Sequence, residues 1–122
     1  IVHSGWKGTG IILKAANALC KRLSVPAEEV GIVFGPGIGP CCYAVDEARV
    51  SYFQRAFGLQ PIRRKGQYYL DLVQANINLL NQYKFHSIRV VDNCTACEGE
   101  LGSYRREGRE HFNRMIALIG FF

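Results

Sequence analysis

Apolar residues recur along this chain with two different spacings, one typical of helices and one typical of strands. Residues 10–23 place apolar side chains three or four positions apart with basic side chains between them, which predicts an amphipathic helix with Thr9 as its N-terminal cap. The same spacing predicts two more helices, over residues 45–57 and 70–83. Asp46 stands near the start of the second helix, where its carboxylate can accept hydrogen bonds from backbone amides.

Short runs of β-branched and other apolar residues lie between these helices and predict strands. They cover the end of a strand at residues 1–3, full strands at 30–34 and 88–91, and a last strand at 114–122. A basic segment, residues 61–69, leads into a further strand or extended stretch. Helices interleaved with four or five strands predict a single α/β or α+β domain over residues 1–122.

Composition agrees with a folded domain that lies outside the membrane. The 122 residues are 48% hydrophobic and 20% charged, which is enough apolar content for a core. The sequence has no apolar run of the roughly 18–20 residues that a membrane-spanning helix needs, and no secretory signal pattern. The only methionine is Met115, so we expect the chain to be a piece of a longer protein.

The net charge of +5 permits anionic partners such as nucleic acid, a membrane surface or a phosphorylated small molecule. The basic residues form short clusters, however, and not one continuous stripe with aromatic residues between them. This arrangement disfavours a nucleic-acid interface. For Lys21, Arg22 and residues 63–65 the simpler interpretation is a solvated basic surface.

Five cysteines are an odd number in a chain without a secretory signal, which favours reduced thiols in a cytoplasmic protein over a disulfide framework. Cys94 and Cys97 have the spacing of half a zinc ribbon or of a redox motif. A ribbon needs a second pair, and Cys41 and Cys42, being adjacent, are not expected to supply one with comfortable geometry. We expect those two to be a small, partly buried pair, and the roles of all four remain open.

Three polar, glycine-rich segments, residues 2–9, 35–43 and 93–109, each follow a predicted strand, and sites often assemble in such loops. In the first, Trp6 and Lys7 offer a stacking surface and a cation beside the imidazole of His3.

The third segment contains Arg105 and Arg106, two guanidiniums that could hold a phosphate group bidentately. The alternative is a basic turn paired with Glu107 and Glu110.

Four segments together resemble the signatures of one protein family. They are His-Ser-Gly-Trp-Lys-Gly at residues 3–8, Gly-Pro-Gly-Ile-Gly-Pro-Cys-Cys-Tyr-Ala-Val at 35–45, Leu-Asp-Leu at 70–72 with Ala75 and Asn76, and Cys94-Thr95 followed by Ser-Tyr-Arg-Arg at 103–106. The family is that of the multicopper polyphenol oxidase, or laccase-domain, proteins. Its members are described as zinc-dependent purine nucleoside phosphorylases with adenosine deaminase activity. The motifs occur in family order over nearly the whole chain, which resembles the C-terminal half of a member.

The resemblance implies an α+β fold with mixed β-sheets flanked by helices, incomplete at the N-terminus. It also implies a zinc ion held by two histidines and one cysteine. Of these three ligands only His3 has a counterpart here, as catalytic and metal-binding residue, and the other two would lie upstream of Ile1. The implied partners are a purine nucleoside and phosphate, and exposed sheet edges would permit a homodimer.

The implied reaction needs an anion site, for which Lys7, Arg105 and Arg106 are the candidate cations. Trp6 and Tyr104 are candidates for stacking on a purine.

The chain also departs from the family pattern. Lys7 replaces an arginine, Gly102 stands where an aromatic residue usually precedes the Ser-Tyr-Arg-Arg motif, and residues 112–114 replace a Thr-Gly-Arg segment. Three histidines without a His-x-His pair do not support a multicopper oxidase. Two other classes stay open: a cysteine-type hydrolase that pairs His3 with a cysteine from outside this chain, and a non-catalytic interaction module.

Overall fold

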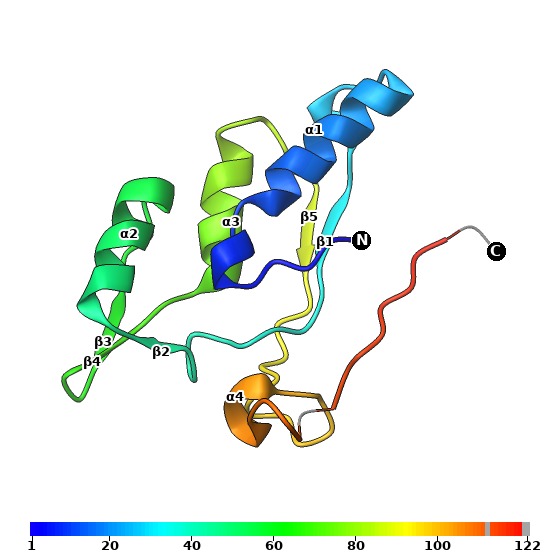
Figure 1. Cartoon of the computed structure of the whole chain (residues 1–122). Coiled ribbons are helices and arrows are strands. Elements are labelled where there is room, and N and C mark those ends of the chain that lie inside the picture. The colour runs from blue at the N-terminus through cyan, green and yellow to red at the C-terminus, as the bar shows by residue number, and fades with distance from the viewer. Residues whose placement is uncertain (112, 121–122) are drawn as a thin grey trace.

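The computed structural model describes residues 1–111 and 113–120 and combines helices with two small sheets (Figure 1). The helices are α1 (Ile11–Leu23), α2 (Glu47–Phe57), α3 (Leu72–Asn81) and the short α4 (Tyr104–Glu107), with 3-10 turns η1 (Trp6–Gly8) and η2 (Ala27–Glu29). The strands are β1 (Ile32–Phe34), β2 (Ala44–Val45), β3 (Ile62–Arg64), β4 (Gln67–Tyr69) and β5 (Ile88–Val90). The α+β class, the three long helices and the strands predicted near residues 30–34 and 88–91 are confirmed.

The starts of the helices show how the sequence sets their bounds. The Asp46 carboxylate accepts a hydrogen bond of 2.7 Å from the Arg49 amide and caps α2, as predicted. The predicted cap at Thr9 is wrong, because α1 begins after Gly10, whose φ of 91° is left-handed. Asn76, distant in sequence, fixes this helix start, since its side-chain oxygen accepts a 2.9 Å hydrogen bond from the amide of the N-cap residue Gly10.

Two sheets organise the chain. Strands β1 and β5 pair in parallel, with Ile32 opposite Ile88, so the loops that follow them leave at the same edge. The second sheet has the order β2-β4-β3 and is antiparallel. Its β3–β4 hairpin accounts for the extended basic segment, and its turn places Lys65 and Gly66 at positive φ, as tight hairpins require.

Two clusters of buried residues form the core. In the first, α2 and α3 pack together and against the second sheet, and Phe53, Leu70 and Ala75 are completely buried. In the second, α1 and the parallel strands enclose Leu80 and Phe85. Burial of each large side chain stabilises the fold by about 1.5–3 kcal/mol. Because α3 contributes buried residues to both clusters, it joins the two sheets.

The strands predicted at the two ends of the chain are wrong for the described residues. Residues 1–3 and 113–120 have no regular secondary structure, and 121–122 lie outside the described part. Ile1 is 77% exposed and Leu118 is 87% exposed, because no described strand lies beside them to cover their apolar side chains. In Figure 1 the segment from residue 113 runs extended, away from the helices. Within the described residues, no helix has the length and apolar character needed to cross a bilayer.

Candidate functional site

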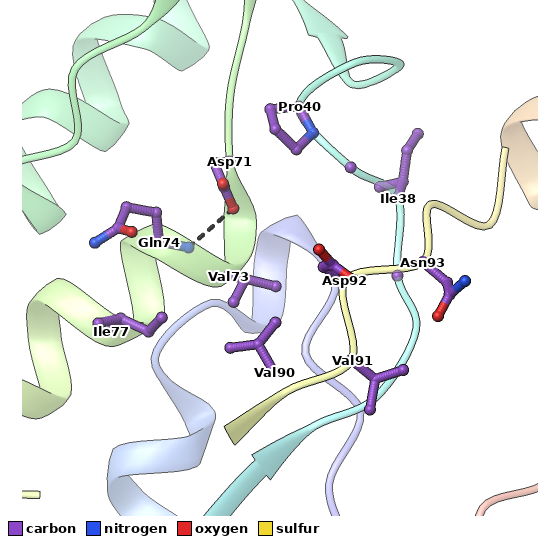
Figure 2. Close-up of a pocket in the computed structure, with 12 residues that line it drawn as sticks. Ile38, Pro40, Asp71, Val73, Gln74, Ile77, Val90, Val91, Asp92 and Asn93 are labelled. Atoms are coloured by element: carbon purple, nitrogen blue, oxygen red, sulfur yellow. Dashed lines mark hydrogen bonds between the residues drawn. The ribbon is translucent and has the colours of Figure 1, made fainter. Parts of the chain in front are cut away.

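Two cavities lie beside the loops that follow β1 and β5. The smaller, of about 190 Å³, lies between α3 and the end of β5, where Val73 and Ile77 lie near Val90 (Figure 2). Asp71 lines it, but its carboxylate is the cap of α3 and accepts a 2.9 Å hydrogen bond from the Gln74 amide. The described lining has no cationic side chain, and the volume is below the roughly 300 Å³ usual for ligand sites.

The larger cavity measures about 660 Å³, within the range of small-molecule sites. It brings together all three segments singled out from the sequence. His3 and Trp6 come from the first, residues 36–38 and Tyr43 from the second, and Thr95 with residues 102–105 from the third. Four of the predicted site residues therefore share one cavity: His3, Trp6, Tyr104 and Arg105. Lys7 and Arg106 lie outside its lining.

The loop that carries His3 is built around Gly5. A Cβ added at Gly5 would lie 3.3 Å from the His3 Nε2 atom, so glycine at this position lets the imidazole pack against the backbone. The Gly8 amide donates a 2.9 Å hydrogen bond to the Gly5 carbonyl, and the Thr9 hydroxyl donates one of 3.3 Å to the same oxygen. Asn76 holds the end of this loop to α3 through the Gly10 amide.

Trp6 has a cationic neighbour that the sequence did not indicate. The Arg49 guanidinium of α2 lies 4.3 Å from the centre of the indole ring, whereas the Lys7 ammonium lies 5.5 Å away. Arg49 also lines the cavity. The sequence signal for Arg49 is its position in the first turn of a capped helix, on the same side as the buried Val50 and Phe53.

Tyr43 is the second residue that sequence reasoning missed as part of the site. Its side chain is 5% exposed, and within the described structure its hydroxyl has no hydrogen-bond partner. Burial raises the pKa of this phenol, against the opposing charge of Arg49, so it stays protonated and able to donate a hydrogen bond. A buried, unpaired hydroxyl beside a cavity is suited to a ligand atom.

The two adjacent arginines of α4 have different surroundings. Arg105 lies 5.5 Å from the Tyr43 ring centre, and its hydrogen bonds to described residues are two long ones of 3.5 Å to the Ala44 carbonyl, which a stronger acceptor can replace.

The Arg106 guanidinium donates short bonds to the carbonyls of Thr95 (2.6 Å), Glu98 (2.7 Å) and Leu101 (2.5 Å). It also pairs with Glu107 at 2.5 Å, which agrees in part with the alternative of a basic turn.

The described residues place no second or third metal ligand beside His3, where the resemblance implies a zinc site. Among them, three or more His, Cys, Asp or Glu ligand atoms come close together at one place only, and His3 is not part of it. That place is formed by Cys41, Cys42, Cys94 and Cys97, whose sulfurs all lie within 4.8 Å of one another.

The expectation that the adjacent cysteines cannot complete a quartet is wrong. The Cys41 and Cys42 sulfurs lie 3.5 Å and 3.4 Å from that of Cys97. A tight turn makes this possible, because the amides of Cys42 and Tyr43 both donate 3.0 Å hydrogen bonds to the Gly39 carbonyl. Four cysteine sulfurs at this spacing can bind a metal ion.

Cys94 is the most buried member of the quartet. Burial raises the pKa of its thiol, but hydrogen bonds from the Gly39 amide, the Cys41 thiol and the amides of Cys97 and Ala96 outweigh this effect and lower the pKa to about 6. The Cys41 thiol has a raised pKa, chiefly because of its hydrogen bond with Cys94.

The chain resembles several known proteins over nearly its whole length. It is 36% identical to the purine nucleoside phosphorylase YlmD of Geobacillus stearothermophilus, over 98% of this chain and 47% of that protein. It is 30% identical to a purine nucleoside phosphorylase of Clostridium acetobutylicum, over 97% of this chain and 51% of that protein. The chain therefore spans about half the length of these curated relatives.

Solved structures agree with the fold. The crystal structure of YlmD from Geobacillus stearothermophilus superposes with a TM-score of 0.74 at 32% identity, over 86% of this chain and 43% of that one. The Bacillus licheniformis protein YfiH gives the same TM-score at 30% identity, over 91% of this chain and 46% of that one. Residues 1–121 match the model of the family described as multi-copper polyphenol oxidoreductase laccase. With its motifs, fold and relatives in agreement, the chain belongs to that family.

Proposed function

We propose that this chain forms the substrate-binding part of a purine nucleoside phosphorylase. The observation that carries the proposal is the 660 Å³ cavity, which combines aromatic faces, the guanidiniums of Arg49, Arg105 and Arg114, and an unpaired buried hydroxyl. Its volume suits a nucleoside together with phosphate. The names of the relatives supply the reaction class.

In this proposal the aromatic residues bind the base. Trp6 or Tyr104 stacks on the purine, and the Tyr43 hydroxyl donates a hydrogen bond to an acceptor on the nucleoside. Because Arg49 lies over the indole ring, it keeps Trp6 in one orientation.

The arginines bind the second substrate. In phosphorolysis a phosphate oxygen forms a bond to the sugar C1′ atom as the bond from C1′ to the purine nitrogen breaks, and the purine leaves with the electron pair. Arg105 and Arg49 would orient the phosphate and offset its charge, and Lys7 and Arg106 remain proposed contributors to the same anion site.

His3 is proposed as this chain's one ligand to the zinc ion that the family resemblance implies. The described residues around it offer no second or third ligand for that ion. Adenosine deaminase activity is part of the proposal and rests on the family resemblance.

The test uses the natural full-length protein, incubated with adenosine with and without phosphate, with products separated by chromatography. Adenine and ribose 1-phosphate that form only with phosphate support the phosphorylase. Inosine formed without phosphate supports the deaminase. Unchanged adenosine in every sample, with inosine and guanosine also unchanged, overturns the proposal.

A pair of variants tests the site itself. Loss of a charge-assisted hydrogen bond of about 1.5–3 kcal/mol predicts that Arg105→Ala raises the KM for phosphate by about 10-fold or more. The matched control is Arg63→Ala on β3, outside the cavity, and its KM should stay within 2-fold of the wild-type value. Equal effects of the two substitutions would contradict the assigned cavity.

A further inference from the structure

The four clustered cysteines form a group that the proposed reaction does not use. They come from two loops more than 50 positions apart in sequence, the turn at Pro40–Tyr43 and the turn at Cys94–Glu98. The fifth cysteine, Cys20, lies apart from them on α1. Such a group can be a redox pair, a chance contact or a metal site.

The distances between the sulfurs match a shared ion. Those from Cys97 to Cys41 and Cys42 are 3.5 Å and 3.4 Å, and no pair in the group exceeds 4.8 Å. A disulfide would need about 2.05 Å. Four sulfurs placed about 2.3 Å from a central zinc ion form a tetrahedron with edges of about 3.8 Å, which lies inside the observed range.

The backbone around the sulfurs is arranged to support thiolates. The Gly39 amide donates a 3.2 Å hydrogen bond to the Cys94 sulfur. The amides of Cys97 and Glu98 donate to the Cys94 carbonyl at 3.0 Å and 2.9 Å, which closes the turn that brings Cys97 back beside Cys94. A Cβ at Gly39 would lie 3.2 Å from both the Cys41 sulfur and the Cys94 Cβ, so glycine leaves the room that this approach requires.

We propose that Cys41, Cys42, Cys94 and Cys97 together bind one Zn²⁺ ion in a closed tetrahedral site. Each coordinating thiol releases its proton to water as its sulfur binds the metal. Four protein ligands leave no open position, so the ion is structural and takes no part in the reaction. An iron–sulfur cluster, in which the thiolates bind different irons, would need the sulfurs farther apart than a single shared ion does.

The ion would join the two loops that form one wall of the large cavity. Gly37 and Ile38, just before the first cysteine pair, line that cavity, and so does Thr95, just after Cys94. Gly37 and Cys94 already form an isolated parallel bridge, and the Thr95 amide donates a 2.9 Å hydrogen bond to the Gly37 carbonyl. A zinc ion beside this bridge would fix the wall without touching a substrate.

The first experiment needs no substitution. The natural full-length protein is stripped of metal under reducing conditions and titrated with Co²⁺, and absorption is recorded. We expect a sulfur-to-cobalt charge-transfer band and intense visible bands of a four-sulfur tetrahedral site, saturating at one equivalent per chain and abolished by Zn²⁺. Absence of a four-sulfur spectrum, or a disulfide among these residues in the freshly purified protein, overturns the proposal.

Variants assign the signal to these residues. Cys42→Ser and Cys97→Ser should each remove the four-sulfur spectrum and lower the zinc content measured by mass spectrometry by one equivalent per chain. Cys20→Ser is the matched control and should retain both the four-sulfur spectrum and the zinc content. His3→Ala should also retain the four-sulfur spectrum. A four-sulfur spectrum that survives in Cys42→Ser and Cys97→Ser, or iron in place of zinc in the purified wild-type protein, would refute the assignment.

Discussion

Replacing Arg106 with alanine separates two roles that this side chain can have. The sequence makes it a candidate cation for the anion site, whereas the structure shows its guanidinium bonded to the carbonyls of Thr95, Glu98 and Leu101 and to Glu107. A guanidinium already engaged in this way has few N–H groups left for a substrate. We therefore expect Arg106→Ala to affect stability and metal retention more than phosphate binding.

The size of the effect follows from the two best-placed bonds. Those to Thr95 and Glu98 measure 2.6 Å and 2.7 Å, and the Arg106 side chain is 29% exposed, so screening by water is incomplete. Hydrogen bonds to charged groups contribute about 1.5–3 kcal/mol each, and the lower value for two bonds gives a loss of about 3 kcal/mol. Proteins of about 150–250 residues lose about 2–4 °C in Tm per kcal/mol, which predicts a decrease of about 6–12 °C.

The assay compares Arg106→Ala with Arg106→Lys and Arg105→Ala in the full-length protein. Thermal unfolding, the KM for phosphate and the zinc affinity of the cysteine quartet are measured for each. Arg106→Lys should recover only part of the stability, because one ammonium cannot reach carbonyls spread over several residues. Since Arg106 holds the Cys94–Glu98 turn, its loss should weaken zinc binding by about 10–100-fold, as is usual for groups that position ligands.

Two results would refute this reasoning. One is an Arg106→Ala protein with an unchanged Tm and a KM for phosphate raised as much as in Arg105→Ala. The other is full rescue of the KM for phosphate by Arg106→Lys with no change in zinc affinity, because a retained positive charge alone would then account for the role of Arg106. Either result would indicate that Arg106 binds phosphate in the anion site.

Three further predictions concern the scaffold. An added Cβ at Gly102 would lie 1.8 Å from the Asn113 carbonyl oxygen, so Gly102→Ala should displace that segment and speed its cleavage in limited proteolysis, while Gly99→Ala, with open space around it, should not. The pKa of Glu107 is lowered, first by a hydrogen bond from the Asn113 amide, so its contribution to stability is complete above the ordinary glutamate pKa of about 4.3 and is lost as the pH falls through the lower folded value. Urea unfolding of the wild type and Glu107→Gln from pH 7 to pH 3 should show that the difference in their free energy of unfolding shrinks in acid. A difference that stays constant with pH would contradict the pairing. Asn76→Ala should cost about 1–3 kcal/mol without changing the m-value, because it leaves the partly buried Gly10 amide and the buried Leu72 carbonyl without their side-chain partner.

The three long helices and the strands β1 and β5 could be predicted because local spacing determines them. The α2 helix is the clearest case, since Asp46 caps it and Gly58 ends it in a left-handed conformation. The start of α1 could not be placed correctly, because the amide of its N-cap residue Gly10 is bonded to Asn76, which lies 66 positions away. The strands predicted at the two ends failed for a related reason: apolar alternation predicts a strand only where a neighbouring strand can pair with it.

The candidate site was predictable in outline from the three loops and their residue types. What the sequence could not show is which guanidiniums face the cavity. Arg105 and Arg106 are adjacent in a four-residue helix, and their directions differ by about 100° of helical turn, which is enough to place one at the cavity and the other on the Cys94–Glu98 turn. The sequence does not indicate Arg49, because it belongs to an ordinary amphipathic helix and faces Trp6 only through tertiary packing.

The cysteine quartet depends on the topology of the parallel sheet. In sequence, Cys41 and Cys42 are adjacent and look unsuited to complete the Cys94–Cys97 pair. Parallel pairing of β1 with β5 sends both following loops from the same edge, and the bridge between Gly37 and Cys94 continues that pairing beyond the strands. The turn at Gly39 then directs both adjacent sulfurs toward Cys97. Because this edge also forms a wall of the larger cavity, a metal bound there would stabilise the loops that shape the substrate site.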